Sequence, residues 1–163
     1  MSWSRRLAAL VLLAPLASCG FHLRGQANYT FSSIYLNATG APVFASELKR
    51  ALEGAGSAKV AATPTAAQVI LDIPSVVDEK DVLSLSPAGS VREYALAMRV
   101  NFRIHDADGL DWLPPAEIVV RRSYTFNETE VLARDAEEQR LLREMQSDAI
   151  AQLIRRLQAA KKP

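Results

Sequence analysis

The most reactive side chains in this sequence are one cysteine and two histidines. Cys19 is the only cysteine among 163 residues, so the chain cannot form an internal disulfide and its fold must depend on packing. His22 and His105 have no histidine four residues away and no cysteine companion, which argues against a metal site. The sequence also has no Gly-rich phosphate loop and no G-x-S-x-G nucleophile motif. We therefore expect a protein that acts by binding, without a cofactor and without catalysis.

Cys19 ends a segment with the three parts of an export signal. Arg5 and Arg6 are followed by ten apolar residues, 7–16, which as a helix would span only about half of a hydrocarbon core. Such a segment predicts a signal peptide rather than a transmembrane helix. The sequence LASC at residues 16–19 resembles the bacterial lipobox, in which the cysteine receives a diacylglycerol and an N-acyl chain. The alternative is a buried structural cysteine after an ordinary signal.

Pairs of carboxylates are a second place to look for chemistry, because two of them can act as general acid and base. They occur at residues 78–81 (DEKD) and at residues 106–108 (DAD). Both stretches are polar and lie between apolar runs, so we expect a solvated turn at each.

Two surfaces are candidates for binding. Arg99, Arg103 and Arg121 lie among small residues on predicted strands and would present cations to an acidic ligand; the alternative is ordinary solvated charge. The turn at Ser84–Ser90 is neutral, and four of its residues would insert into a partner or a lipid; the alternative is a plain hairpin tip. The residues of this candidate insertion turn are Leu85, Ser86, Pro87 and Gly89.

Composition is that of one globular domain. The chain is 49% hydrophobic, with 19 basic and 18 acidic residues, and loss of the first 18 residues leaves a net charge of about −1. This balance excludes the strongly basic surface of a general nucleic-acid binder. We expect a signal peptide at 1–18, an acylated tether at 19–28, one domain at 29–158 and a frayed tail at 159–163.

Hydrophobic periodicity predicts four strands and two helices in the order β-α-β-β-β-α. The strands are expected at residues 31–36, 69–77, 94–104 and 118–126, and the helices at 42–53 and 131–157. Pro74 cannot donate a ladder hydrogen bond, so the second strand is an edge or is bulged there. Asp135 is expected to cap the last helix, with Glu138 at the capping-box position.

The clearest pattern is a strict alternation of six large apolar residues, which predicts a long half-buried antiparallel strand. These residues are Tyr94, Leu96, Met98, Val100, Phe102 and Ile104. In the following strand Arg122 falls on the apolar face, which indicates either a bend in the pleat or the rim of the sheet. The expected fold is α+β, with two helices packed on one face of a four-stranded, mainly antiparallel sheet.

Several stretches taken in order resemble the LPS-assembly lipoprotein family, LptE. They are Cys19–Arg24 (CGFHLR), Arg92–Tyr94 (REY), Arg122–Asn127 (RSYTFN), Val131–Ala133 (VLA), and Glu138 with Met145–Leu157. Together they cover nearly all of residues 19–157, in the same element order as the family.

The resemblance implies a lipoprotein of the outer membrane that is not an enzyme. Members of this family plug and help to assemble the β-barrel protein of the LptD type that delivers lipopolysaccharide to the cell surface, and they contact lipopolysaccharide. Gly20, rather than aspartate, after the cysteine implies sorting to the outer membrane, with the domain facing the periplasm and the barrel lumen. The alternatives are a free-standing periplasm-facing adaptor or lipid carrier, or a small envelope hydrolase.

The resemblance also implies which residues contact the ligand. In the family one basic residue in the turn before the long strand and another before the last helix are linked to lipopolysaccharide contact. The second matches Arg134. The first falls on a turn that has Pro87 and no cation here, with Arg92 nearby. Arg134, Arg92 and Arg99 are therefore the candidate lipopolysaccharide-binding residues.

Overall fold

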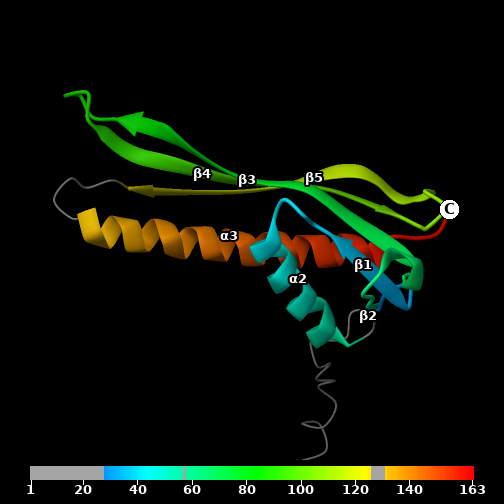
Figure 1. The fold of residues 1–163 in the computed structure, drawn as a ribbon. Coiled ribbons are helices and arrows are strands. Elements are labelled where there is room, and N and C mark those ends of the chain that lie inside the picture. Colours follow the sequence, from blue (N-terminus) through cyan, green and yellow to red (C-terminus); the bar gives the residue numbers. More distant parts are fainter. Residues whose placement is uncertain (1–27, 57, 126–130) are drawn as a thin grey trace, which may run out of the picture.

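The computed structural model describes residues 28–56, 58–125 and 131–163, and the side chains of 131–134 lie outside this description. One long helix runs beneath a long sheet in an elongated molecule (Figure 1). The elements in chain order are β1 (Ser33–Asn37), α2 (Pro42–Ala55), β2 (Lys59–Val60), the 3₁₀ helix η2 (Pro64–Ala66), β3 (Val69–Leu85), β4 (Val91–His105), β5 (Asp111–Thr125) and α3 (Val131–Ala159). The predicted α+β class and its principal elements are confirmed.

The sheet has one more strand than the sequence predicted, and it is mixed. Its order is β2-β1-β3-β4-β5, in which β3, β4 and β5 are antiparallel neighbours while β1 is parallel to both β2 and β3. Strands β1 and β2 are parallel because helix α2 lies between them. A helical crossover carries the chain back, so that the next strand runs in the same direction as the first. The extra strand β2 has only two residues, too few to give any periodic signal.

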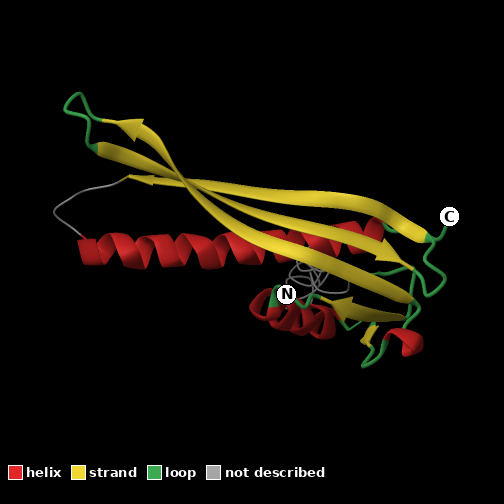
Figure 2. Cartoon of the chain, turned by 45° about the horizontal axis from the view of Figure 1, so that its top comes forward, coloured by secondary structure: helices red, strands yellow, loops and turns green. Residues whose placement is uncertain are grey.

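Both helices cover the same face of the sheet, as predicted, and the other face is open (Figure 2). The core between the layers consists of apolar side chains, and no polar or charged residue in the described part of the chain is buried. Its fully buried members include Ile34 of β1, Leu48 and Leu52 of α2, Leu71 of β3, Phe102 and Ile104 of β4, and Met145, Leu153 and Leu157 of α3.

Helix α2 has the ends that its sequence predicts. Pro42 occupies the first turn, where a missing N–H costs nothing, and Gly56 ends the helix in the left-handed region with φ of 71°. Phe44, Leu48 and Leu52 are its buried residues, at the spacing of one helical face.

Strand β3 is bulged at Pro74, which was one of the two predicted alternatives. Its ladder with β4 shifts between the pairs Asp72–Arg103 and Ser75–Asn101, so that Ile73 and Pro74 together lie opposite one residue. The extra residue reverses the alternation of β3. Leu71 and Ile73 face the helices before the bulge, whereas Asp78 and Lys80 do so after it, because they pair with inward-facing residues of β4.

The charged stretch at 78–81 is not a solvated turn, as the sequence indicated, but part of β3. All four residues pair in register with β4, from Asp78–Met98 to Asp81–Ala95. The long alternation of β4 supplies a template that outweighs the low strand propensity of the charged residues. The hairpin turn lies between Leu85 and Val91, which confirms the turn predicted at Ser84–Ser90. The predicted turn at 106–109 is confirmed, with Gly109 at φ of 84°.

Arg122 is neither at a bend nor at a rim. It pairs with Leu96 on the helix-facing side of β5, and its guanidinium donates to the carboxylate of Asp148 on α3. The predicted cap at Asp135 is wrong, because α3 begins at Val131 and Asp135 lies inside the helix. Glu138 therefore does not complete a capping box.

The chain end after α3 is partly held in place. Ala160, which the sequence analysis assigned to a frayed tail, is buried, and its carbonyl accepts a hydrogen bond of 2.7 Å from the Thr30 hydroxyl. Residues 161–163 are exposed.

Candidate functional site

The β3–β4 hairpin rises away from α3 at the end of the molecule where that helix begins (Figure 1). We call residues 82–92 the hairpin end. It contains the predicted insertion turn and Arg92, so the structure brings two of the candidate features together there.

The hairpin end exposes large apolar side chains. Val82, Leu83 and Leu85 are 51%, 55% and 57% exposed, and they are three of the six large apolar residues exposed in the described part of the chain. The ladder with β4 shifts register on both sides of Ser84, so the strand is irregular where these residues lie. An exposed apolar cluster of this kind is a candidate surface for contact with a partner or a lipid.

The turn of the hairpin is closed by its own hydrogen bonds. The Gly89 amide donates to the Ser86 carbonyl at 2.9 Å, and the Ser90 amide donates to the Ser86 hydroxyl at 3.1 Å. Gly89 has φ of 83°, a backbone conformation that residues other than glycine rarely adopt. The turn therefore presents the apolar side chains on a defined backbone.

The cations that the sequence analysis singled out lie in different places. Arg92 is exposed at the start of β4 and makes no ion pair with any residue that the structure describes. The backbone of Arg134 belongs to the first turns of α3, at the same end of the molecule, and its side chain lies outside the described residues.

Arg99 is on the other face of the sheet and is not a free cation. Its guanidinium bonds Glu79 of β3 at 3.0 Å and Glu117 of β5 at 3.3 Å, so that one ion-pair ladder crosses three strands. Arg103 is likewise held by Asp111 at 2.5 Å. Two of the three cations proposed for an acidic ligand on this face are thus neutralised within the fold, and only Arg121 has no ion pair among the described residues.

A polar cluster that sequence reasoning missed lies between the hairpin and α3. We call Lys80, Tyr94, Tyr124 and Glu138 the Lys80 cluster. The ammonium of Lys80 is 2.5 Å from the Glu138 carboxylate and 4.5 Å from the centre of the Tyr94 ring. The Tyr124 hydroxyl donates to the same carboxylate oxygen at 2.5 Å. Only the register shift at Pro74 brings Lys80 to this side of the sheet. Pro74 indicated a bulge or an edge, but the sequence analysis placed residues 78–81 in a turn and so did not follow the strand beyond the bulge.

The Lys80 cluster shifts the ionisation of its members. Partial burial favours the neutral form of Glu138, but the hydrogen bonds from Lys80 and Tyr124 outweigh it and lower the pKa of this carboxyl. Burial would lower the pKa of Lys80, yet the contacts with Glu138 and Tyr124 raise it. Both groups are therefore charged at neutral pH and hold the start of α3 to β3.

The histidine that the structure describes also has a structural partner. The Nε2 of His105 lies 2.9 Å from the carboxylate of Asp72, and its Nδ1 lies 2.7 Å from the carbonyl of Asp106. Among the described residues no three His, Cys, Asp or Glu side chains gather as metal ligands. None of the described helices is long and apolar enough to cross a membrane. His22 and Cys19 lie outside the described residues.

A sheet covered on one face by two helices is a fold that solved lipoproteins share. The solution NMR structure of an uncharacterized lipoprotein B from Nitrosomonas europaea is 35% identical, with a TM-score of 0.76 over 86% of this chain and 91% of that one. The crystal structure of rare lipoprotein B from Shewanella oneidensis has the same fold, with a TM-score of 0.68 at 23% identity over 78% of this chain and 95% of that chain.

Sequence comparison gives the family. The family model described as "LptE: Lipopolysaccharide-assembly" matches residues 31–157. A relative from Photorhabdus laumondii, named LPS-assembly lipoprotein LptE, is 30% identical over 158 residues, which are 94% of this chain and 85% of that protein. This chain belongs to the LptE family, as its ordered motifs indicated.

We expect acid to loosen the Lys80 cluster. The pKa of Glu138 is lowered in the folded protein from its ordinary value of 4.5, so its stabilising effect is present above that value and is lost as the pH falls through the folded pKa. Glu138→Gln should lower the free energy of unfolding by about 1 kcal/mol at neutral pH and flatten its decline between about pH 5 and about pH 3. Urea unfolding at a series of pH values measures both effects.

Glu144→Gln is the matched control, because Glu144 is exposed on the same helix and among the described residues pairs only with Arg140. The free energy of unfolding of Glu144→Gln should follow that of the wild type at every pH. If Glu138→Gln does so as well, the Lys80 cluster does not stabilise the fold.

Proposed function

We propose that this chain is an outer-membrane lipoprotein that plugs the β-barrel through which lipopolysaccharide reaches the cell surface and helps that barrel to assemble. The observation that carries the proposal is the family match over residues 31–157, together with relatives that are named for lipopolysaccharide assembly. The chain then acts by binding and has no catalytic role.

The shape of the molecule fits a plug. A single long helix under a narrow sheet gives an elongated body that can enter a barrel lengthwise (Figure 1). The open face of the sheet carries paired charges such as the Glu79–Arg99–Glu117 ladder, and a polar face of this kind suits the polar interior of a large barrel. The hairpin end supplies the apolar surface that a partner would cover.

Attachment to the membrane is proposed to occur through lipid on Cys19. Two or more acyl chains are needed for stable anchoring, because each buried CH₂ contributes about 0.8 kcal/mol and one chain alone binds reversibly. A thioether-linked diacylglycerol with an N-acyl chain meets that need. The anchor would hold the domain on the periplasmic side, from which it enters the barrel lumen.

Contact with lipopolysaccharide is proposed at the end of the molecule that holds the hairpin end and the start of α3. A ligand with anionic groups and acyl chains needs cations beside an apolar surface. Arg92 and Arg134 are the cations proposed for this contact, and Val82, Leu83 and Leu85 are the apolar side chains. Arg99 is left out of this proposal, since its guanidinium is already held by two carboxylates on the other face.

The barrel proposal predicts a stable complex. Full-length tagged lipoprotein, pulled down from detergent-solubilised outer membranes, should recover one large β-barrel protein. Leu83→Asp should lower that recovery several-fold, because it puts a charge into the apolar surface that the partner covers. Val43→Asp is the matched control: Val43 is 66% exposed on α2, so that this change also replaces an exposed apolar residue.

Recovery of no large β-barrel protein would contradict the plug and favour a free-standing adaptor or lipid carrier. Equal loss of recovery for Leu83→Asp and Val43→Asp would contradict the assignment of the interface to the hairpin end.

The ligand proposal predicts an effect of charge reversal at Arg134. Immobilised lipopolysaccharide should capture Arg134→Asp about tenfold less well than the wild type, since a hydrogen bond between ions contributes roughly 1.5–3 kcal/mol. The loss should shrink at high salt, where charges are screened. Arg121→Asp is the control, because Arg121 is exposed on the open face of the sheet. Unchanged capture by Arg134→Asp would overturn the role of Arg134 in ligand contact.

A further inference from the structure

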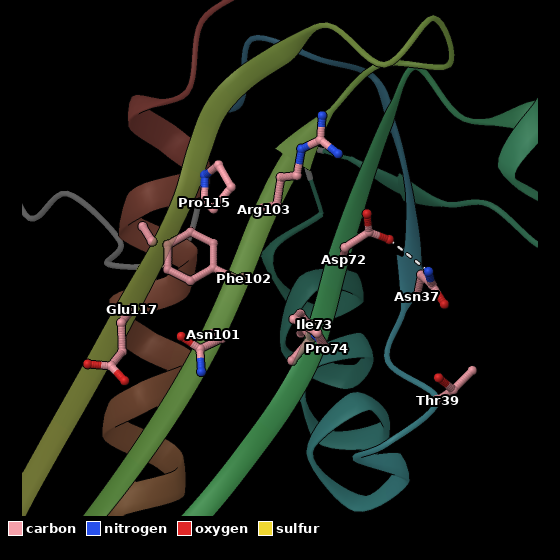
Figure 3. Close-up of a pocket in the computed structure, with 11 residues that line it drawn as sticks. Asn37, Thr39, Asp72, Ile73, Pro74, Asn101, Phe102, Arg103, Pro115 and Glu117 are labelled. Atoms are coloured by element: carbon pink, nitrogen blue, oxygen red, sulfur yellow. Dashed lines mark hydrogen bonds between the residues drawn. The ribbon is translucent and has the colours of Figure 1, made fainter.

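The open face of the sheet contains a hollow of about 750 Å³ that none of the proposed contacts uses. It lies where β1 ends and β3 bulges, with both helices behind the sheet (Figure 3). The hairpin end is at the opposite end of β4. The hollow is thus separate from the hairpin end, and it shares the open face of the sheet with the Glu79–Arg99–Glu117 ladder.

Two breaks in the sheet create the hollow. On one side of Phe102 the bulge at Pro74 interrupts the ladder between β3 and β4. On the other side the register between β4 and β5 shifts after the pair Phe102–Ala116, where Pro114 and Pro115 occur. Proline cannot donate a ladder hydrogen bond, so regular pairing stops on both sides of β4 at the same level.

The floor and walls of the hollow are apolar. Phe102 and Ile73 are buried beneath it and close it toward the core. Pro74 of β3 and Pro115 of β5 are exposed and line it on either side of β4 (Figure 3). The C–H faces of separate rings of one ligand can therefore lie against the two prolines.

The rim of the hollow is rich in hydrogen-bond acceptors. The Asn37 amide nitrogen donates to Asp72 at 2.7 Å, and the Asn101 amide nitrogen donates to Ser75 at 3.0 Å, which leaves both amide oxygens without a partner among the described residues. One carboxylate oxygen of Glu117 accepts from Arg99 at 3.3 Å, and in the described part of the chain the other accepts nothing. The Thr39 hydroxyl also lines the hollow.

The charges around the hollow select against anions. Arg103 is held by Asp111, and Asp72 accepts from the Asn37 amide and lies beside His105. Arg99 is shared between Glu79 and Glu117, so this ion-pair ladder keeps one net negative charge. A phosphate or carboxylate would meet the Glu117 carboxylate and the amide oxygens with no free cation except the remaining Arg103 nitrogen. Neutral hydroxyl groups, which donate hydrogen bonds, fit the acceptors best.

We propose that this hollow binds a short neutral oligosaccharide, whose hydroxyl groups donate to Asn37, Asn101 and Glu117 while the C–H faces of its sugar rings lie on Pro74 and Pro115. An apolar floor with a few convergent polar groups is the usual form of a ligand site, and here those groups are hydrogen-bond acceptors. The saccharide comes either from a free glycan or from the sugar part of a glycolipid, because the hollow recognises only their common chemistry. The inference does not depend on the proposed function.

Saturation-transfer NMR on the full-length protein, held in a sugar-free detergent, tests this inference. The probes are maltotriose, chitotriose and mannotriose. At least one should receive saturation on its C–H protons, with a dissociation constant on the order of 1 mM. Thr39→Trp should abolish the transfer by filling the hollow from an exposed loop position. Glu117→Gln should weaken it several-fold while keeping an oxygen for Arg99.

Arg121→Gln is the matched control on the same face and strand, and it should leave the transfer unchanged. A comparison of maltose with decyl maltoside then distinguishes the two sources of the saccharide. Equal affinity for both compounds indicates a free glycan. Tighter binding of decyl maltoside indicates a glycolipid, provided that Thr39→Trp abolishes this binding. Glucose 6-phosphate should bind less well than glucose. No transfer to any of the three oligosaccharides, or transfer that survives Thr39→Trp, would overturn the proposal.

Discussion

The bulge at Pro74 determines how the two faces of this sheet differ. One extra residue in β3 exchanges the faces toward which the following side chains point. In the charged stretch at 78–81, Lys80 therefore points toward the helix and Glu79 toward the open face. Lys80 then meets Glu138 and ties the start of α3 to the hairpin, while Glu79 meets Arg99. The same interruption opens the hollow beside Phe102. Without the bulge, Glu79 would face the helix and Lys80 would face solvent.

This constraint divides the molecule into a packed part and a projecting part. The packed part is the apolar core between the helices and the sheet, closed at its far end by the Lys80 cluster. Beyond that cluster the hairpin rises from the helix and exposes Val82, Leu83 and Leu85. The hairpin thereby carries an apolar surface that the described part of the fold does not cover. The proposed contact with a partner requires such a surface.

The sequence predicted most of the fold because its elements have strong periodic signals. The alternation of six apolar residues in β4 is confirmed in position and in the face that it buries, and the last helix is confirmed close to its predicted bounds. Strand β2 was missed, because two residues are too few to show a period. The length of β3 was underestimated, because the charged residues 78–81 have low strand propensity and only their pairing with β4 keeps them in the strand. Arg122 shows the limit of pattern reasoning: its position on the apolar face was read correctly, but its partner Asp148 is distant in the sequence and only the packed structure identifies it.

The candidate site was predicted less well than the fold, for a physical reason. Exposure of Leu85 and the position of Arg92 follow from local sequence, whereas the pairing of Arg99 depends on the register of two neighbouring strands. The central claim is that the hairpin end contacts the barrel. A photo-crosslinking amino acid at position 83 of the full-length lipoprotein in intact cells tests it most directly. The account predicts a crosslink to one large β-barrel protein from position 83 and none from position 43; a crosslink from position 43 alone, or from neither, would contradict it.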